Sequence, residues 1–137
     1  MKKLILTAAL ILVVGTTFGQ TLQKGNFIGL HVMTINLDPD VTMNQFLDFY
    51  VNKYIPEFEK NFPGVKMYIV KGIRGENENS FGFVSFTDSE EVRDKYYNKN
   101  GTLNELGKSA FEKLQPTTEE LQKLGTHTST YTDWVIQ

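Results

Sequence analysis

The chain has 137 residues, no cysteine and a formal net charge of −2. The absence of cysteine excludes disulfides, thiolate metal sites and cysteine nucleophiles. Because the charged residues are interspersed and form no basic block, the sequence also argues against a nucleic-acid partner.

The first nineteen residues have the pattern of a cleavable secretory signal. Residues 1–3 are positively charged at the start, residues 4–14 form an uncharged apolar run, and small residues precede a cut between Gly19 and Gln20. The run is shorter than the roughly 20 residues that span a membrane, and an uncleaved N-terminal anchor is the alternative. We therefore expect a periplasmic or secreted protein whose mature chain, 20–137, is a single domain without membrane attachment.

The segment 27–37 predicts the first strand. His31 shares one face of this strand with the apolar residues 27, 33, 35 and 37, while Ile28, Leu30 and Val32 share the other face. An antiparallel strand with one solvated face would alternate between apolar and polar residues. Both faces of this strand are therefore expected to be covered.

A helix is predicted after the first strand. Thr42 and Gln45 form a capping box at its start, and apolar residues follow at helical spacing as far as Phe58. Pro56 lies inside this pattern and should kink the helix or restart it. The segment 62–64, Phe-Pro-Gly, closes the helix as a turn.

The second half of the chain predicts three more strands and several helical pieces. The strands are expected at 65–73, 81–86 and 127–136, and the helices at 88–97, 102–115 and 117–124. The helices start at capping boxes opened by Asp88, Thr102 and Thr117. Pro116 is expected to separate the last two helices.

The element order β-α-β-β-α-β, with extra helical pieces before the last strand, predicts an α+β ferredoxin-like fold. Its four-stranded antiparallel sheet would place the first strand between the third and the fourth. Helices cover one face, and the other face would carry Ile28, Leu30, Val32, Val84, Phe86, Trp134 and Ile136. An apolar patch of this size predicts a homodimer through the sheet face. The alternative is a one-residue register error in the predicted pairing, which would exchange the faces.

This element order resembles the dimeric α/β-barrel superfamily, which includes antibiotic-biosynthesis monooxygenase-like, EthD-like and NIPSNAP-like domains. The most specific local match is Tyr54–Pro56 followed by Pro63–Val65. EthD-like members tend to have His-x-Pro at the end of the first helix and Pro-Gly before the second strand. Tyr54 stands where that histidine would be, so a histidine-dependent role does not transfer. The resemblance implies a dimeric α/β-barrel.

Several residues are candidates for a site. His31 and Tyr54 are the best catalytic candidates, and Tyr50, Tyr68, Arg74, Tyr131 and Trp134 are candidates for ligand binding because aromatic and guanidinium groups anchor planar or anionic ligands. Each has a structural alternative as an ordinary core or strand residue. His127 is expected at a strand edge on the surface, and Asp133 either at a solvated sheet end or orienting a partner. Two separated histidines predict no metal site.

Three functions follow as hypotheses. The leading one is an exported dimeric α/β-barrel protein that uses no cofactor and binds a small apolar or aromatic ligand. The second is a cofactor-independent oxygenase, or a haem-binding relative, that uses His31. The third is a self-associating structural domain without a ligand site.

Overall fold

A computed structural model describes residues 21–137, so the predicted export signal lies outside the described residues. The chain forms β1 (Phe27–Leu37), α1 (Met43–Phe49), a π-helical turn η1 (Tyr50–Tyr54), α2 (Ile55–Asn61), β2 (Lys66–Lys71), β3 (Phe81–Thr87), α3 (Glu90–Asp94), α4 (Glu105–Gln122) and β4 (Gly125–Val135). No helix within 21–137 has the length and apolar character needed to cross a membrane.

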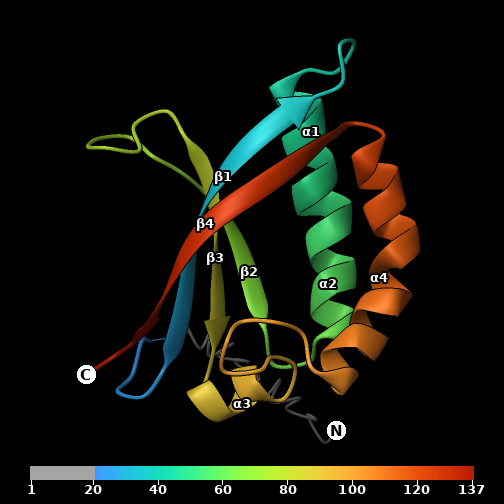
Figure 1. The fold of residues 1–137 in the computed structure, drawn as a ribbon. Helices are drawn as coiled ribbons and strands as arrows, with labels where there is room; N and C mark the ends of the chain where they lie inside the picture. The colour runs from blue at the N-terminus through green and yellow to red at the C-terminus, as the bar shows by residue number, and fades with distance from the viewer. Residues whose placement is uncertain (1–20) are drawn as a thin grey trace, which may run out of the picture.

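The four strands form one antiparallel sheet in the order β2-β3-β1-β4 (Figure 1). The first strand therefore lies between the third and the fourth, which confirms the predicted α+β ferredoxin-like topology. β1 is central and pairs along its whole length with β4. Both β1 and β4 are long enough to carry side chains from one end of the sheet to the other.

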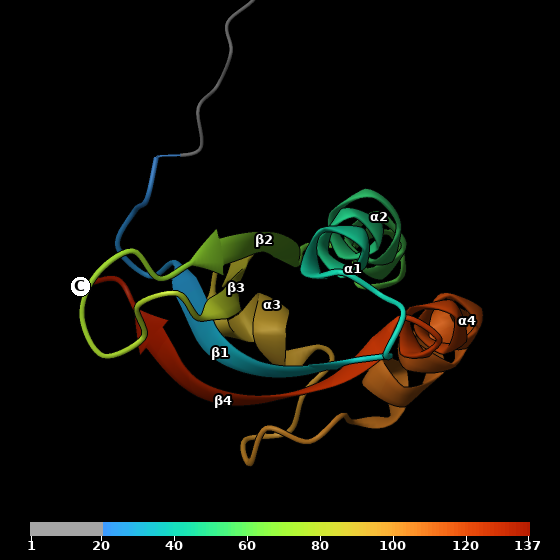
Figure 2. The same cartoon turned by 90° about the horizontal axis from the view of Figure 1, so that it is seen from above.

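The main helices lie on one side of the sheet. Seen from above, the sheet curls from β2 to β4, and α1, α2 and α4 close its concave side (Figure 2). The core between these layers contains Phe46 and Leu114, both with 0% of their surface exposed, together with Phe62, Val65 and Leu121. The concave side is called the inner face below.

The two faces of the sheet differ in exposure. On the inner face, Met33 is 6% exposed. On the outer face, Leu30 is 42% exposed and Trp134 is 57% exposed. The register pairs Leu30 with Val84, and Ile28 with Trp134. The predicted grouping of these side chains on one face is therefore confirmed, although Phe86 of the same face is itself buried.

The helix after β1 is continuous and contains the π-helical turn η1. The capping box at its start is confirmed, with Thr42 N–H donating to Gln45 Oε1 over 2.8 Å. Pro56 lies in the first turn of α2, where a missing N–H costs least. Ahead of it, the Ile55 N–H bonds to the Tyr50 carbonyl five residues back. The helix thus restarts at the proline, and the π turn makes the junction.

The later helices depart from the expected boundaries. α3 starts after Ser89, whose hydroxyl accepts from the Val92 N–H, and α4 starts after Asn104. The prediction that Pro116 separates two helices is wrong, because α4 runs through it. Leu114 is fully buried against the core just ahead of the proline, and the Thr118 hydroxyl bonds back to the Leu114 carbonyl at 3.2 Å. Tertiary packing therefore outweighs the local cost of the proline.

Candidate functional site

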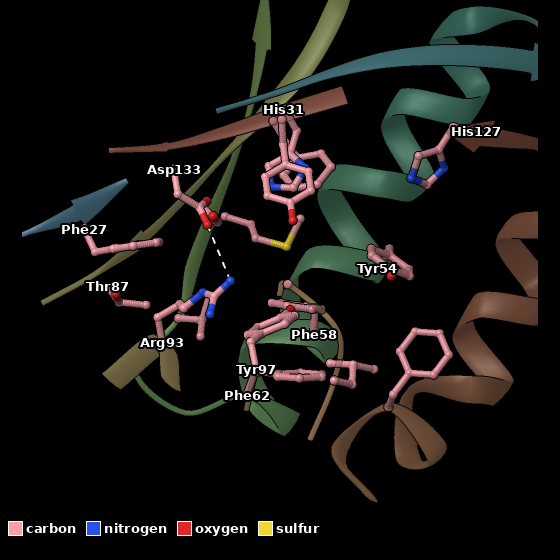
Figure 3. Close-up of a pocket in the computed structure, with 18 of the residues that line it drawn as sticks. Phe27, His31, Tyr54, Phe58, Phe62, Thr87, Arg93, Tyr97, His127 and Asp133 are labelled. Atoms are coloured by element: carbon pink, nitrogen blue, oxygen red, sulfur yellow. Dashed lines mark hydrogen bonds and ion pairs between the residues drawn. The ribbon is translucent and has the colours of Figure 1, made fainter. Parts of the chain in front are cut away.

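A cavity of about 270 Å³ lies between the inner face of the sheet and the helices (Figure 3). Its wall is mainly aromatic, and only a few polar side chains line it. The aromatic wall includes Phe27, Tyr50, Tyr54, Phe58, Phe62, Phe83, Tyr97, Phe111 and Tyr131. An apolar cavity of about 150 Å³ can hold benzene, so this one has room for a ligand of one or two rings.

His31 is the centre of a flat stack on the sheet. Its ring lies 4.0 Å from that of Phe83 with an interplanar angle of 16°, and 5.0 Å from that of Tyr131 with an angle of 18°. The three residues are direct cross-strand neighbours, on β3, β1 and β4. They line the cavity together, and because Phe83 and Tyr131 cover the two faces of the imidazole, only the edge of the His31 ring is open to a ligand.

The His31 ring is also polar toward the cavity. Its Nδ1 lies 3.3 Å from Ser129 Oγ. Burial lowers the pKa of His31 to about 4, because the charged imidazolium is poorly solvated there. At neutral pH the ring is therefore uncharged and can accept a proton.

Three polar atoms gather above Gly29, on the inner face of β1. In the register, Gly29 lies between Ser85 of β3 and Asp133 of β4. A side-chain carbon built on Gly29 would lie 3.0 Å from Asp133 Oδ1 and 3.4 Å from His31 Nε2, and would overlap the Ser85 hydroxyl. Because glycine has no such carbon, the Ser85 hydroxyl can fill this space, and the three polar atoms come together beside the cavity that their side chains line. We call Gly29, His31, Ser85 and Asp133 the Gly29 niche.

Arg93 of α3 holds the niche from the side (Figure 3). Its side chain is only 13% exposed, and its Nη2 lies 3.4 Å from Asp133 Oδ2. Its Nη1 donates to Asp94 Oδ1 at 3.1 Å and to the Asn98 carbonyl at 2.9 Å. Burial raises the pKa of Asp133, and the Arg93 charge opposes this shift. Arg93 thus ties the sheet, α3 and the loop after it into one wall.

A second polar group lies away from the niche, beside the π turn. The Tyr50 hydroxyl lies 3.5 Å from His127 Nε2, and the Tyr50 and Tyr54 rings are 4.8 Å apart. Burial raises the pKa of both tyrosines, and a hydrogen bond with Thr118 partly opposes the shift of Tyr54. Both hydroxyls are therefore protonated at neutral pH. The π turn carries both rings, and such turns are frequent at functional sites.

The structure brings four of the seven predicted candidates together. His31, Tyr50, Tyr54 and Tyr131 line the cavity, and Tyr68, Arg74 and Trp134 do not. Tyr68 pairs with Val84 and is 52% exposed on the outer face, where Trp134 also lies. Arg74 is in the exposed β2–β3 loop. Tyr68 and Trp134 lie outside the cavity because alternate strand positions point to opposite faces of the sheet.

Four residues of the site were missed or misplaced by the sequence. His127 was expected on the surface, but its ring packs against Phe46 and Tyr50 on the inner face, and burial lowers its pKa. Asp133 was left undecided, and Ser85 and Arg93 carried no signal of their own. The available signal was register, since Ser85 and Asp133 are both paired with Gly29.

Metal ligation has no obvious place in this arrangement. Within residues 21–137, no group of three or more His, Cys, Asp or Glu side chains is placed to hold a metal ion. The niche offers one imidazole, one carboxylate and one hydroxyl, and the carboxylate is already paired with Arg93. This donor set suits hydrogen bonding and proton transfer.

No protein-family model matches the chain, and a search of curated protein sequences gives no match. Among solved structures, it is similar to SnoaB, a cofactor-independent oxygenase from Streptomyces nogalater, with 11% identity, a TM-score of 0.49 and coverage of 82% of this chain and 94% of that one. It is also similar to a dimeric ferredoxin-like protein of unknown function from Bacteroides fragilis, with 10% identity, a TM-score of 0.43 and coverage of 82% and 98%.

An EthD family protein from Bacillus halodurans is a third similar structure, with 16% identity, a TM-score of 0.39 and coverage of 76% of this chain and 96% of that one. It comes from the family whose Pro-Gly motif the sequence resembles. At these values the likenesses concern fold alone, so function is argued below from the cavity.

Proposed function

We propose that the protein binds a small planar aromatic molecule with a polar substituent in the cavity on the inner face. The observation that carries this proposal is the stack of Phe83, His31 and Tyr131, which lines an aromatic cavity that also has polar groups at the Gly29 niche and beside the π turn. Ligand sites are typically apolar, with a few placed polar groups that set orientation. This cavity has that composition.

The test uses 2-naphthol as the probe and equilibrium dialysis of the purified protein as the measurement. Tyr131 and Tyr68 are matched, since they are 49% and 52% exposed but lie on opposite faces of the sheet. Tyr131→Leu should weaken 2-naphthol binding about fivefold by removing a stacking partner. Tyr68→Leu should leave it unchanged. Absence of saturable binding, or equal losses in both variants, would contradict the proposal.

A second candidate is cofactor-independent chemistry that begins with proton abstraction. It is favoured by the position of His31, whose Nε2 lies beside the aromatic cavity, whereas the pKa of about 4 that burial gives this histidine makes it a weak base. A bound phenol or an acidic ring C–H would transfer its proton to this nitrogen, and in an oxygenase the resulting anion would then react with dioxygen. A haem-binding role is not supported, because Nε2 faces Asp133 and Ser85 rather than open space for an iron.

Solvent exchange tests this second candidate. NMR follows the incorporation of deuterium from D₂O at carbon 1 of 2-naphthol. This exchange should be faster with the protein than without it. His31→Phe keeps a stacking ring and should abolish the acceleration, while Tyr68→Leu, a change on the outer face, should retain it. No acceleration in the unmodified protein would remove the enzymatic candidate and leave the binding proposal in place.

We further propose that the protein is an exported homodimer that buries the outer face. Leu30, Tyr68 and Trp134 are exposed there. Val84 pairs with both Leu30 and Tyr68, and Trp134 pairs with Ile28, so an isologous contact would cover one continuous surface. Light scattering should give a dimer mass for the unmodified protein and for Leu106→Asp, a change at an exposed leucine of α4. Leu30→Asp should give a monomer, and a monomeric unmodified protein would refute the proposal.

Export predicts an N-terminus at Gln20 in the secreted material.

A further inference from the structure

The Gly29 niche presents hydrogen-bond acceptors to the cavity. Asp133 uses Oδ2 toward Arg93, at 3.4 Å, and turns Oδ1 toward the space above Gly29. A carboxylate oxygen of this kind only accepts. The atom of a ligand placed in the niche therefore meets a charged acceptor first.

The other two polar side chains of the niche are consistent with this polarity. The Ser85 hydroxyl donates to the Gly29 carbonyl at 3.4 Å, so its lone pairs are left for a ligand. When His31 Nδ1 donates to Ser129 Oγ at 3.3 Å, the lone pair of Nε2 also faces the niche. A ligand group that donates a hydrogen bond would satisfy these acceptors.

The positive charge of Arg93 does not change this preference of the niche for a hydrogen-bond donor. Arg93 is already shared between two carboxylates, Asp133 and Asp94, and its Nη1 also donates to the Asn98 carbonyl. The net charge of Arg93, Asp133 and Asp94 taken together is therefore negative. An anionic ligand group such as a carboxylate would be repelled by this net negative charge, and it would have to compete with Asp133 and Asp94 for the Arg93 guanidinium.

Resting on the proposed function, we propose that the Gly29 niche binds a hydroxyl donor of the ligand, so that the substrate class is neutral phenols and enols rather than aromatic carboxylates. Glycine at position 29 is part of the arrangement, because a side chain there would displace the Ser85 hydroxyl and crowd Asp133. The aromatic ring would lie against the stack formed by Phe83, His31 and Tyr131.

Three naphthalene probes separate the possibilities: 2-naphthol donates, 2-methoxynaphthalene only accepts, and 2-naphthoate is an anion. Equilibrium dialysis measures the binding of all three probes, whose concentrations are determined by absorbance. We expect 2-naphthol to bind about tenfold more tightly than 2-methoxynaphthalene, the size expected for a hydrogen bond to a charged group, and 2-naphthoate to bind most weakly. Asp133→Asn should lower the affinity ratio of naphthol to methoxynaphthalene several-fold, because a neutral amide oxygen is a weaker acceptor than a carboxylate.

Asp94→Asn is the matched control, because it also removes a carboxylate from Arg93 but does not face the cavity. It should keep the tenfold ratio. If the probes bind without preference for the hydroxyl, or if Asp133→Asn keeps the ratio, the niche proposal is overturned while aromatic binding stands. If none of the three probes binds, the proposed function fails as well.

Discussion

Both faces of the sheet carry large apolar side chains, but the polar side chains beside them differ. On the inner face, His31, Ser85 and Asp133 converge above a glycine and beside an aromatic cavity. On the outer face, Leu30 and Trp134 lie in the open without such a cluster. The difference teaches that apolar content does not distinguish a ligand face from an assembly face. Convergent polar atoms with room beside them do.

The largest expected effect comes from truncating one side chain on each face of β1. Met33→Ala should lower the free energy of unfolding by about 2–5 kcal/mol, because Met33 is buried at 6% exposure in the core. Leu30→Ala should lower it by less than about 1 kcal/mol in the monomer. Urea denaturation at low protein concentration measures both. Equal losses would mean that the outer face is buried within the monomer.

Acidification should destabilise the inner face through His31. The pKa of His31 is about 4 in the folded protein, because of burial, and 6.5 in the unfolded chain, so the unfolded chain binds more protons between these values. The contribution of His31 to stability should be fully present above pH 6.5 and should be lost as the pH drops from 6.5 to 4, by less than the full pKa difference implies because the ring is only partly buried.

His31→Phe should reduce this pH dependence of the unfolding free energy and leave the smaller part that comes from His127, whose pKa burial also lowers. Denaturation curves at several pH values measure the slope. An unchanged slope in His31→Phe would show that the imidazole is solvated in the folded protein.

The smallest expected effect on stability is seen when substitutions of two arginines are compared. Arg93→Gln should cost about 1–3 kcal/mol of stability, because it leaves Asp133 and Asp94 without their partner in a partly buried wall. Arg74→Gln, in the exposed β2–β3 loop, should change stability by no more than about 0.5 kcal/mol. Thermal unfolding measures both. If Arg93→Gln is as mild as Arg74→Gln, the ion pair with Asp133 does not hold the niche.

Much of the fold could be predicted because its signals are local. Alternation within β1 predicted both faces correctly, and the capping box at Thr42 marked the start of the first helix. Pro116 led to a wrong prediction of a helix boundary. Its cost to the helix is local, whereas the burial of Leu114 and Leu121 against the core depends on tertiary packing. The element order was sufficient for the topology.

The site was harder to predict because it depends on register between strands far apart in the sequence. His31 and Tyr131 were identified, but nothing near Ser85 or Asp133 in the sequence indicates that both lie beside Gly29. Trp134 was assigned to the pocket although its neighbour Asp133 is the residue that faces it. A one-residue difference in a strand separates the two faces.

The most direct test of the account is a crystal structure of the protein with bound 2-naphthol. We predict the ring on the inner face, against His31 and Tyr131, with its oxygen above Gly29 within hydrogen-bonding distance of Asp133 Oδ1. A probe found on the outer face, against Leu30 and Trp134, would contradict the central claim. A ring in the cavity with its oxygen turned toward Tyr50 would contradict the niche alone.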